Sequence, residues 1–126
     1  MRRSLSMDSK VMTQRASRVS VSALPFLLRV RCAPRMVVQR ADVVQAGRAI
    51  ASSGGSTLPL LVEVSALREV TWDARQAVLS YRHPARVVIL GSDAVDLVLT
   101  AFTVRSPMTI RFFTDRDDAV RWLLQR

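Results

Sequence analysis

The residues able to carry chemistry are few in this sequence. His83 is the only histidine and Cys32 the only cysteine among 126 residues. A serine–histidine–acid triad would have to use His83, but no serine stands in a Gly-x-Ser-x-Gly turn. A zinc site needs several His or Cys ligands at fixed spacing, and one cysteine allows no disulfide within the chain. We therefore expect no catalytic centre, no metal and no cofactor, and we place His83 in a solvated loop.

Two polar clusters have structural explanations. Residues 91–93 join a strand to a helix, where backbone amides hold anions in other proteins. Here Asp93 and Asp96 disfavour phosphate, and Ser92 is the expected N-cap. Residues 115–118 (DRDD) place negative charge in the first turn of the last helix, where the helix dipole favours it. The four glycines form neither a Walker nor a dinucleotide-binding pattern.

The elements that position these residues repeat one unit, a strand followed by a helix. The expected strands are 58–64, 86–91 and 108–113, and the helices that follow the first two are 71–81 and 92–103. The last helix follows Thr114, its expected N-cap. This order predicts a single α/β domain with a mixed, mostly parallel sheet of four or five strands and about four helices.

The amino-terminal part of the domain is expected to add a strand at residues 21–32. Leu28, Val30 and Cys32 alternate with arginines there, which is typical of a strand with one wet face, at or near an edge of the sheet. A second short strand is expected at 36–38, followed by a helix at 41–52.

Three features of these elements bear on packing and interactions. Gly47 is expected to allow its helix a close approach to the sheet. Glu63 is expected to end its strand in solvent. The helix 92–103 has Val95, Val98, Leu99 and Phe102 on one face and further apolar residues on the other. One sheet face cannot hide so much apolar surface, so either a partner or other elements of the chain cover it.

The net charge of +9 belongs mostly to the beginning of the chain. Residues 1–40 hold nine basic residues and one acid, whereas the other 86 hold ten and nine. Residues 1–20 lack apolar clustering, so we expect a flexible basic tail before a domain at 21–126. Translation could equally start at Met7 or Met12. The tail also resembles a mitochondrial transit peptide in its Arg and Ser content, although it lacks an apolar face.

The tail offers a nucleic-acid-binding alternative. Without aromatic residues to stack on bases, such binding would be weak, salt-sensitive and blind to sequence. The basic residues concerned are Arg2, Arg3, Lys10, Arg15 and Arg18. No apolar run approaches the roughly 20 residues of a membrane span, and no secretory signal is evident. With a single cysteine, these features favour the cytoplasm.

Three segments resemble the STAS superfamily of sulphate-transporter and anti-sigma-factor-antagonist domains, especially its actinobacterial, SpoIIAA-like members. They are 58–74, 86–102 and the closing 111–123, whose residues match the pattern F-T-D-x-x-x-A-x-x-W-L. The resemblance covers roughly residues 22–126. It implies a non-enzymatic regulatory or protein-interaction domain.

The resemblance also implies a site at the beginning of the helix 71–81. In anti-sigma-factor antagonists this helix opens with an Asp-Ser-Ser-Gly-like motif whose phosphorylated serine controls binding to a kinase partner. Here the motif is replaced by residues 71–74, with Asp73 at the phosphoserine position. A serine switch is therefore not expected. Asp73 either mimics a permanent phosphoserine or only suits the helix dipole, and Thr71 is the expected N-cap.

The expected partner-binding residues are Thr71, Trp72, Asp73 and Arg75, together with the exposed part of the helix 92–103. The resemblance implies a protein partner, such as a regulatory kinase-like or signalling protein, and a second copy of the chain is a further candidate.

Overall fold

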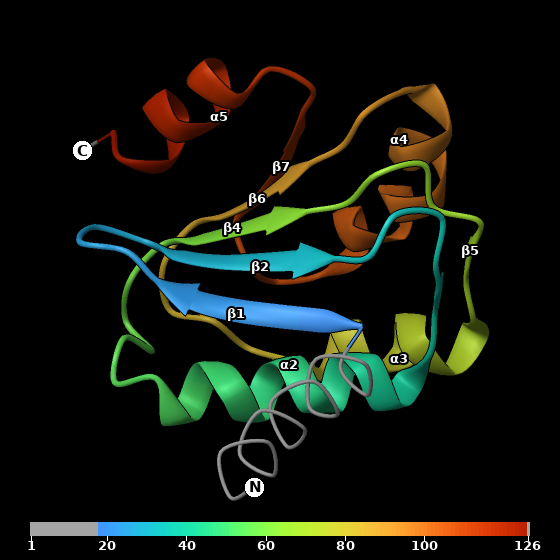
Figure 1. The fold of residues 1–126 in the computed structure, drawn as a ribbon, viewed down its shortest axis with the longest axis horizontal. Coiled ribbons are helices and arrows are strands. Elements are labelled where there is room, and N and C mark those ends of the chain that lie inside the picture. Colours follow the sequence, from blue (N-terminus) through green and yellow to red (C-terminus); the bar gives the residue numbers. More distant parts are fainter. Residues whose placement is uncertain (1–17, 126) are drawn as a thin grey trace, which may run out of the picture.

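The computed structural model describes residues 18–125, which form an α/β domain (Figure 1). Its elements in chain order are β1 (Val19–Ala23), β2 (Leu28–Cys32), β3 (Val37–Val38), α2 (Arg40–Ser52), β4 (Leu60–Glu63), β5 (Glu69–Val70), α3 (Trp72–Ser80), β6 (Val87–Leu90), α4 (Ala94–Thr100), the 3₁₀ helix η1 (Ala101–Arg105), β7 (Ile110–Phe113) and α5 (Arg116–Leu123). The expected architecture of a mixed, mostly parallel sheet with about four helices is confirmed.

The main sheet has five strands in the order β1-β2-β4-β6-β7. Only β1 runs antiparallel, in a hairpin with β2, while β2, β4, β6 and β7 are parallel to one another. Their carboxyl ends therefore meet at one edge of the sheet. All four residues of β6 are buried, as expected of a parallel strand covered on both faces. The short strands β3 and β5 pair separately, in parallel, beyond that edge.

Helices cover both faces of the sheet. α2 and α3 lie against one face, and α5 lies against the other (Figure 1). Side chains of the strands alternate between the two sides, so the larger core, with Val30, Leu60 and Ile89, lies under α2 and α3. The smaller core, with Leu61 and Val88, packs against α5.

The amino-terminal strand differs from its expected form. Residues 21–32 are two strands rather than one, because the chain turns back at residues 24–27, where the Leu24 amide donates to the Leu27 carbonyl at 2.9 Å. β1 begins at Val19, two residues before the expected start of the domain. Residues 1–17, which hold most of the expected tail, lie outside the described residues. The short strand expected at 36–38 is confirmed as β3.

Two local predictions were wrong. The N-cap of α5 is Asp115, whose carboxylate accepts from the Asp118 amide, and not Thr114. His83 is not solvated: it is only 7% exposed, and its Nε2 lies 2.6 Å from the Leu58 carbonyl oxygen. Nε2 therefore donates that hydrogen bond, and Nδ1 lies 3.4 Å from the Tyr81 hydroxyl oxygen. This pairing explains why a loop histidine tolerates burial.

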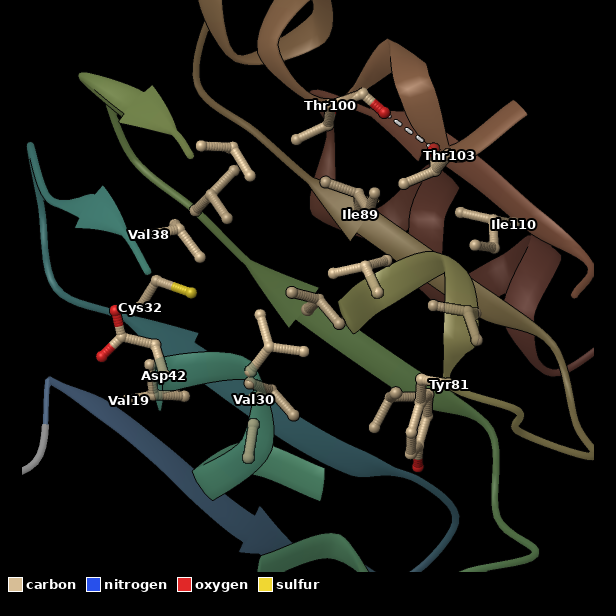
Figure 2. Close-up of a pocket in the computed structure, with 18 of the residues that line it drawn as sticks. Val19, Val30, Cys32, Val38, Asp42, Tyr81, Ile89, Thr100, Thr103 and Ile110 are labelled. Atoms are coloured by element: carbon tan, nitrogen blue, oxygen red, sulfur yellow. Dashed lines mark hydrogen bonds between the residues drawn. The ribbon is translucent and has the colours of Figure 1, made fainter. Parts of the chain in front are cut away.

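The larger core is not fully packed. A cavity of about 160 Å³ lies between the sheet and the layer formed by α2, α3 and η1 (Figure 2). The cavity is partly open to solvent.

Candidate functional site

The candidate site begins where β5 ends and α3 starts, beyond the carboxyl edge of the main sheet. Thr71 directly follows β5, and its amide donates to the Val38 carbonyl at 3.0 Å, which extends the pairing of β3 with β5. Its hydroxyl oxygen accepts from the Ala74 amide at 3.2 Å. The prediction that Thr71 is an N-cap is confirmed. Its hydroxyl is thereby committed to holding the helix start.

The next two residues face solvent. Trp72 is the first residue of α3, and 70% of it is exposed. Asp73 is exposed one position later, in the first turn, where the positive end of the helix dipole favours its charge. The helix start therefore exposes a large aromatic side chain and a carboxylate at two successive positions.

Arg75 points back into the protein. Its Nε donates to the Val70 carbonyl at 3.1 Å, and its guanidinium carbon lies 5.6 Å from the centre of the Phe102 ring. The side chain is half-buried. Of the four expected site residues, Trp72 and Asp73 are thus displayed, whereas Thr71 and Arg75 hold the surrounding structure.

A second apolar surface lies close by, on α4. This helix contacts β5, the strand that leads into Thr71. Val95, Leu97 and Val98 of α4 are 53%, 46% and 70% exposed. The expectation that the helix would have more apolar surface than the sheet hides is therefore met. No other element of the described residues covers Val95 and Val98, and α4 turns Asp96 and Thr100 inward instead.

That inward face is built around Asp96, which is fully buried. Its Oδ2 accepts from the Ser92 hydroxyl and amide, both at 2.8 Å, and from the Ala66 amide at 3.1 Å. Its Oδ1 accepts from the Leu67 amide at 2.7 Å. Ala66 has φ = 51°, in the left-handed region, so these bonds also hold a strained turn. Burial alone would raise the pKa of Asp96, but the hydrogen bonds from Ser92, Leu67 and Ala66 outweigh it, and the pKa lies below its usual value.

The role of Asp96 was missed in the sequence. Asp96 was treated only as a charge that repels anions, and Ser92 was expected to be the N-cap. The cap is Asp93, whose carboxylate accepts from the Asp96 amide at 3.0 Å. Ser92 instead donates to Asp96. No local pattern predicts this arrangement, because the other donors come from residues 66 and 67, which precede Asp96 by 30 and 29 positions.

Glu63 was expected to end its strand in solvent, and this was wrong. It is the last residue of β4, but its side chain is only 13% exposed. Arg29 donates to it through Nε at 2.9 Å and Nη2 at 3.1 Å, Arg116 donates at 2.7 Å, and Arg31 lies 3.6 Å away. Burial alone would raise the pKa of Glu63, but the hydrogen bonds from Arg29 and Arg116 lower it. The cluster joins β2, β4 and α5 on the face opposite the cavity.

The described residues 18–125 contain no group of three or more His, Cys, Asp or Glu side chains arranged to hold a metal. None of the helices within that range is long and apolar enough to span a membrane. Arg18, one of the basic residues assigned to the tail, forms an ion pair with the buried Asp42 of α2 and donates to the Val37 carbonyl at 3.1 Å. It is therefore part of the domain.

No protein-family model matches the sequence, and none of the curated proteins is significantly similar to it. Among solved structures, the chain is similar to an uncharacterised protein of the DUF3478 family from Shewanella loihica PV-4, which has a SpoIIAA-like fold. The match has a TM-score of 0.58 and 18% sequence identity, and it covers 83% of this chain and 91% of the other. The fold is therefore SpoIIAA-like, as expected from the sequence.

Proposed function

We propose that this chain is a non-enzymatic regulatory domain that binds a protein partner through the beginning of α3. The observation that carries the proposal is the exposure of Trp72, at 70%, at the start of α3. Tryptophan is among the residues that contribute most to protein interfaces. The exposed Val95, Leu97 and Val98 of α4 offer a further apolar surface.

Asp73 gives this surface a negative charge, and it is the residue that relates the surface to regulation by phosphorylation. At the position that the STAS resemblance equates with the phosphoserine, an aspartate supplies a fixed negative charge and no hydroxyl to phosphorylate. We therefore propose a domain without a serine switch, whose partner recognises a carboxylate next to an indole ring. Thr71 and Arg75 support the surface by fixing the helix start and its neighbour η1.

Asp73→Lys and Trp72→Ala test the proposal in the full chain. Captured partners from a host-cell lysate would be quantified by mass spectrometry for wild type and each variant. Asp117→Lys is the matched control for the first change, because Asp117 occupies the same position in the first turn of α5. Phe26→Ala controls the second: Phe26 is 71% exposed in the turn between β1 and β2, at the other end of the strands.

We expect the two α3 variants to lose the same partner by at least tenfold while both controls retain it. Unchanged capture by folded Asp73→Lys and Trp72→Ala proteins would overturn the proposal. If the captured partner is a second copy of the chain, sedimentation of wild type and Trp72→Ala will show it as a dimer that dissociates in the variant.

A further inference from the structure

We propose that the cavity under α2 and α3 is a binding site for a small, uncharged, apolar molecule of about the size of toluene. Its walls come from every layer of the larger core: the strands contribute Val30, Val62 and Ile89, and the helices contribute Ala46, Val78 and Phe102 (Figure 2). These side chains expose only carbon and hydrogen atoms to a bound ligand.

The polar groups in the wall are already paired within the protein. The carboxylate of Asp42 accepts hydrogen bonds from the Arg18 guanidinium and from the backbone amide of Gln39. The Thr103 hydroxyl donates to the Thr100 carbonyl at 2.8 Å, as Figure 2 shows, and the Thr100 hydroxyl donates to the Asp96 carbonyl at 2.7 Å. Across residues 18–125, every buried side-chain nitrogen and oxygen has a hydrogen-bond partner. A water molecule needs two to four polar partners to be stable in a cavity, and the hydroxyl hydrogens of Thr100 and Thr103 are already donated to the backbone.

The same walls exclude a charged ligand. Cys32 lies at the end of the cavity next to Asp42 (Figure 2), and burial, aided by the charge of Asp42, raises the pKa of its thiol to about 11. The thiol is therefore neutral at pH 7 and cannot serve as a counter-ion. Moving an ionised group into such surroundings without a partner is strongly unfavourable. The ligand must be uncharged.

The volume sets the size of the ligand. An apolar cavity of about 150 Å³ in another protein stays dry and binds benzene, and the present cavity of about 160 Å³ is of the same size. Sites for drug-sized ligands are usually larger, at roughly 300–1,000 Å³, so a single small ring suits the volume of this cavity best. Val43, Tyr81 and Phe102 in its lining are only half-buried, and the cavity is partly open to solvent, so a small molecule can reach it.

Thermal unfolding of the full chain with toluene tests the proposal, with benzoate as a comparator that has the same ring and a negative charge. At a toluene concentration ten times its Kd, we expect the Tm to rise by about 5 °C, with no rise in benzoate. Methyl NMR identifies the place: resonances of Ile89 should shift, while those of Leu61, on the opposite face of the sheet, should not.

Val62→Phe fills the cavity from the sheet and should weaken toluene binding at least tenfold. Val98→Phe makes the same change on the exposed side of α4 and should leave binding intact. If Val62→Phe does not fold, Ala46→Leu fills the cavity from α2. An unchanged Tm of the wild type in toluene would overturn the proposal. So would equal binding by a filled variant, or shifts at Val98 without shifts at Ile89.

Discussion

The guanidinium of Arg75 lies over the ring of Phe102, with 5.6 Å between its central carbon and the ring centre. This contact joins two parts of the molecule with separate proposed roles. Arg75 belongs to the start of α3, where Trp72 and Asp73 form the proposed partner surface, and Phe102 lines the cavity. A cavity ligand that displaces the Phe102 ring would therefore also change the contact with Arg75 on α3, the helix that presents the partner surface.

The Arg75–Phe102 contact should be measurable as a coupling energy. We expect Arg75→Gln to destabilise the domain by about 1 kcal/mol, since it loses the ring contact and the hydrogen bond to the Val70 carbonyl. In a double-mutant cycle with Phe102→Leu, measured by urea unfolding, the coupling should be about 0.5–1 kcal/mol. Arg68→Gln, at an exposed position, is the control. A coupling of zero would show that the two side chains only lie close together.

Substitution of Asp96 should destabilise the domain more than substitution of any other carboxylate residue. Asp96→Asn replaces one acceptor oxygen by an amide that faces the donors of Ser92, Ala66 or Leu67, so we expect a loss of about 3 kcal/mol. Asp93→Asn makes the same change three residues earlier, but asparagine is an equally good N-cap, so its effect should stay below about 0.5 kcal/mol. Chemical denaturation of both variants gives the comparison, and equal losses would refute the anchoring role of Asp96.

The repeated strand–helix order was predictable because its signals are local. Each strand is a short apolar run and each helix a three- and four-residue periodicity, and the cap at Thr71 is set by residues 71–74 alone. The hairpin between β1 and β2 escaped prediction because its turn, Leu24-Pro25-Phe26-Leu27, is apolar and lacks the Asn, Asp or Gly that usually marks one.

The missed parts of the site depend on contacts between distant segments. His83 can be buried because it donates a hydrogen bond to the Leu58 carbonyl. Glu63 can be largely buried because Arg29 of β2 and Arg116 of α5 donate hydrogen bonds to it. The burial of Asp96 likewise needs donors 30 and 29 residues away. From the sequence alone, a charged or polar residue is expected to be exposed. The hydrogen-bond partners that allow its burial are known only once the fold is known.

Stability should fall in acid as Asp96 and Glu63 become protonated. Both have a pKa in the folded protein below that of the unfolded chain, where Asp and Glu titrate near about 4. Their contribution is therefore fully present above about pH 4 to 5 and is lost as the pH falls through the lower folded values. Urea unfolding between pH 7 and pH 2 should show this loss. Asp96→Asn should flatten the profile, and a variant with the full wild-type pH dependence would contradict the assignment.

Two glycines should respond in opposite directions to the same substitution. Gly47 lies inside α2, and a Cβ there would meet the Tyr81 ring at 3.6 Å, an ordinary contact, so Gly47→Ala should stabilise the domain by about 0.5–1 kcal/mol through helix propensity. Gly91 follows β6, and its Cβ would lie 2.6 Å from Phe112 and 2.8 Å from the Cβ of Asp96. Gly91→Ala should therefore cost about 1–3 kcal/mol. Thermal and urea unfolding of both variants measure the effects, and unchanged stability of Gly91→Ala would contradict the close packing of Phe112 and Asp96 against Gly91.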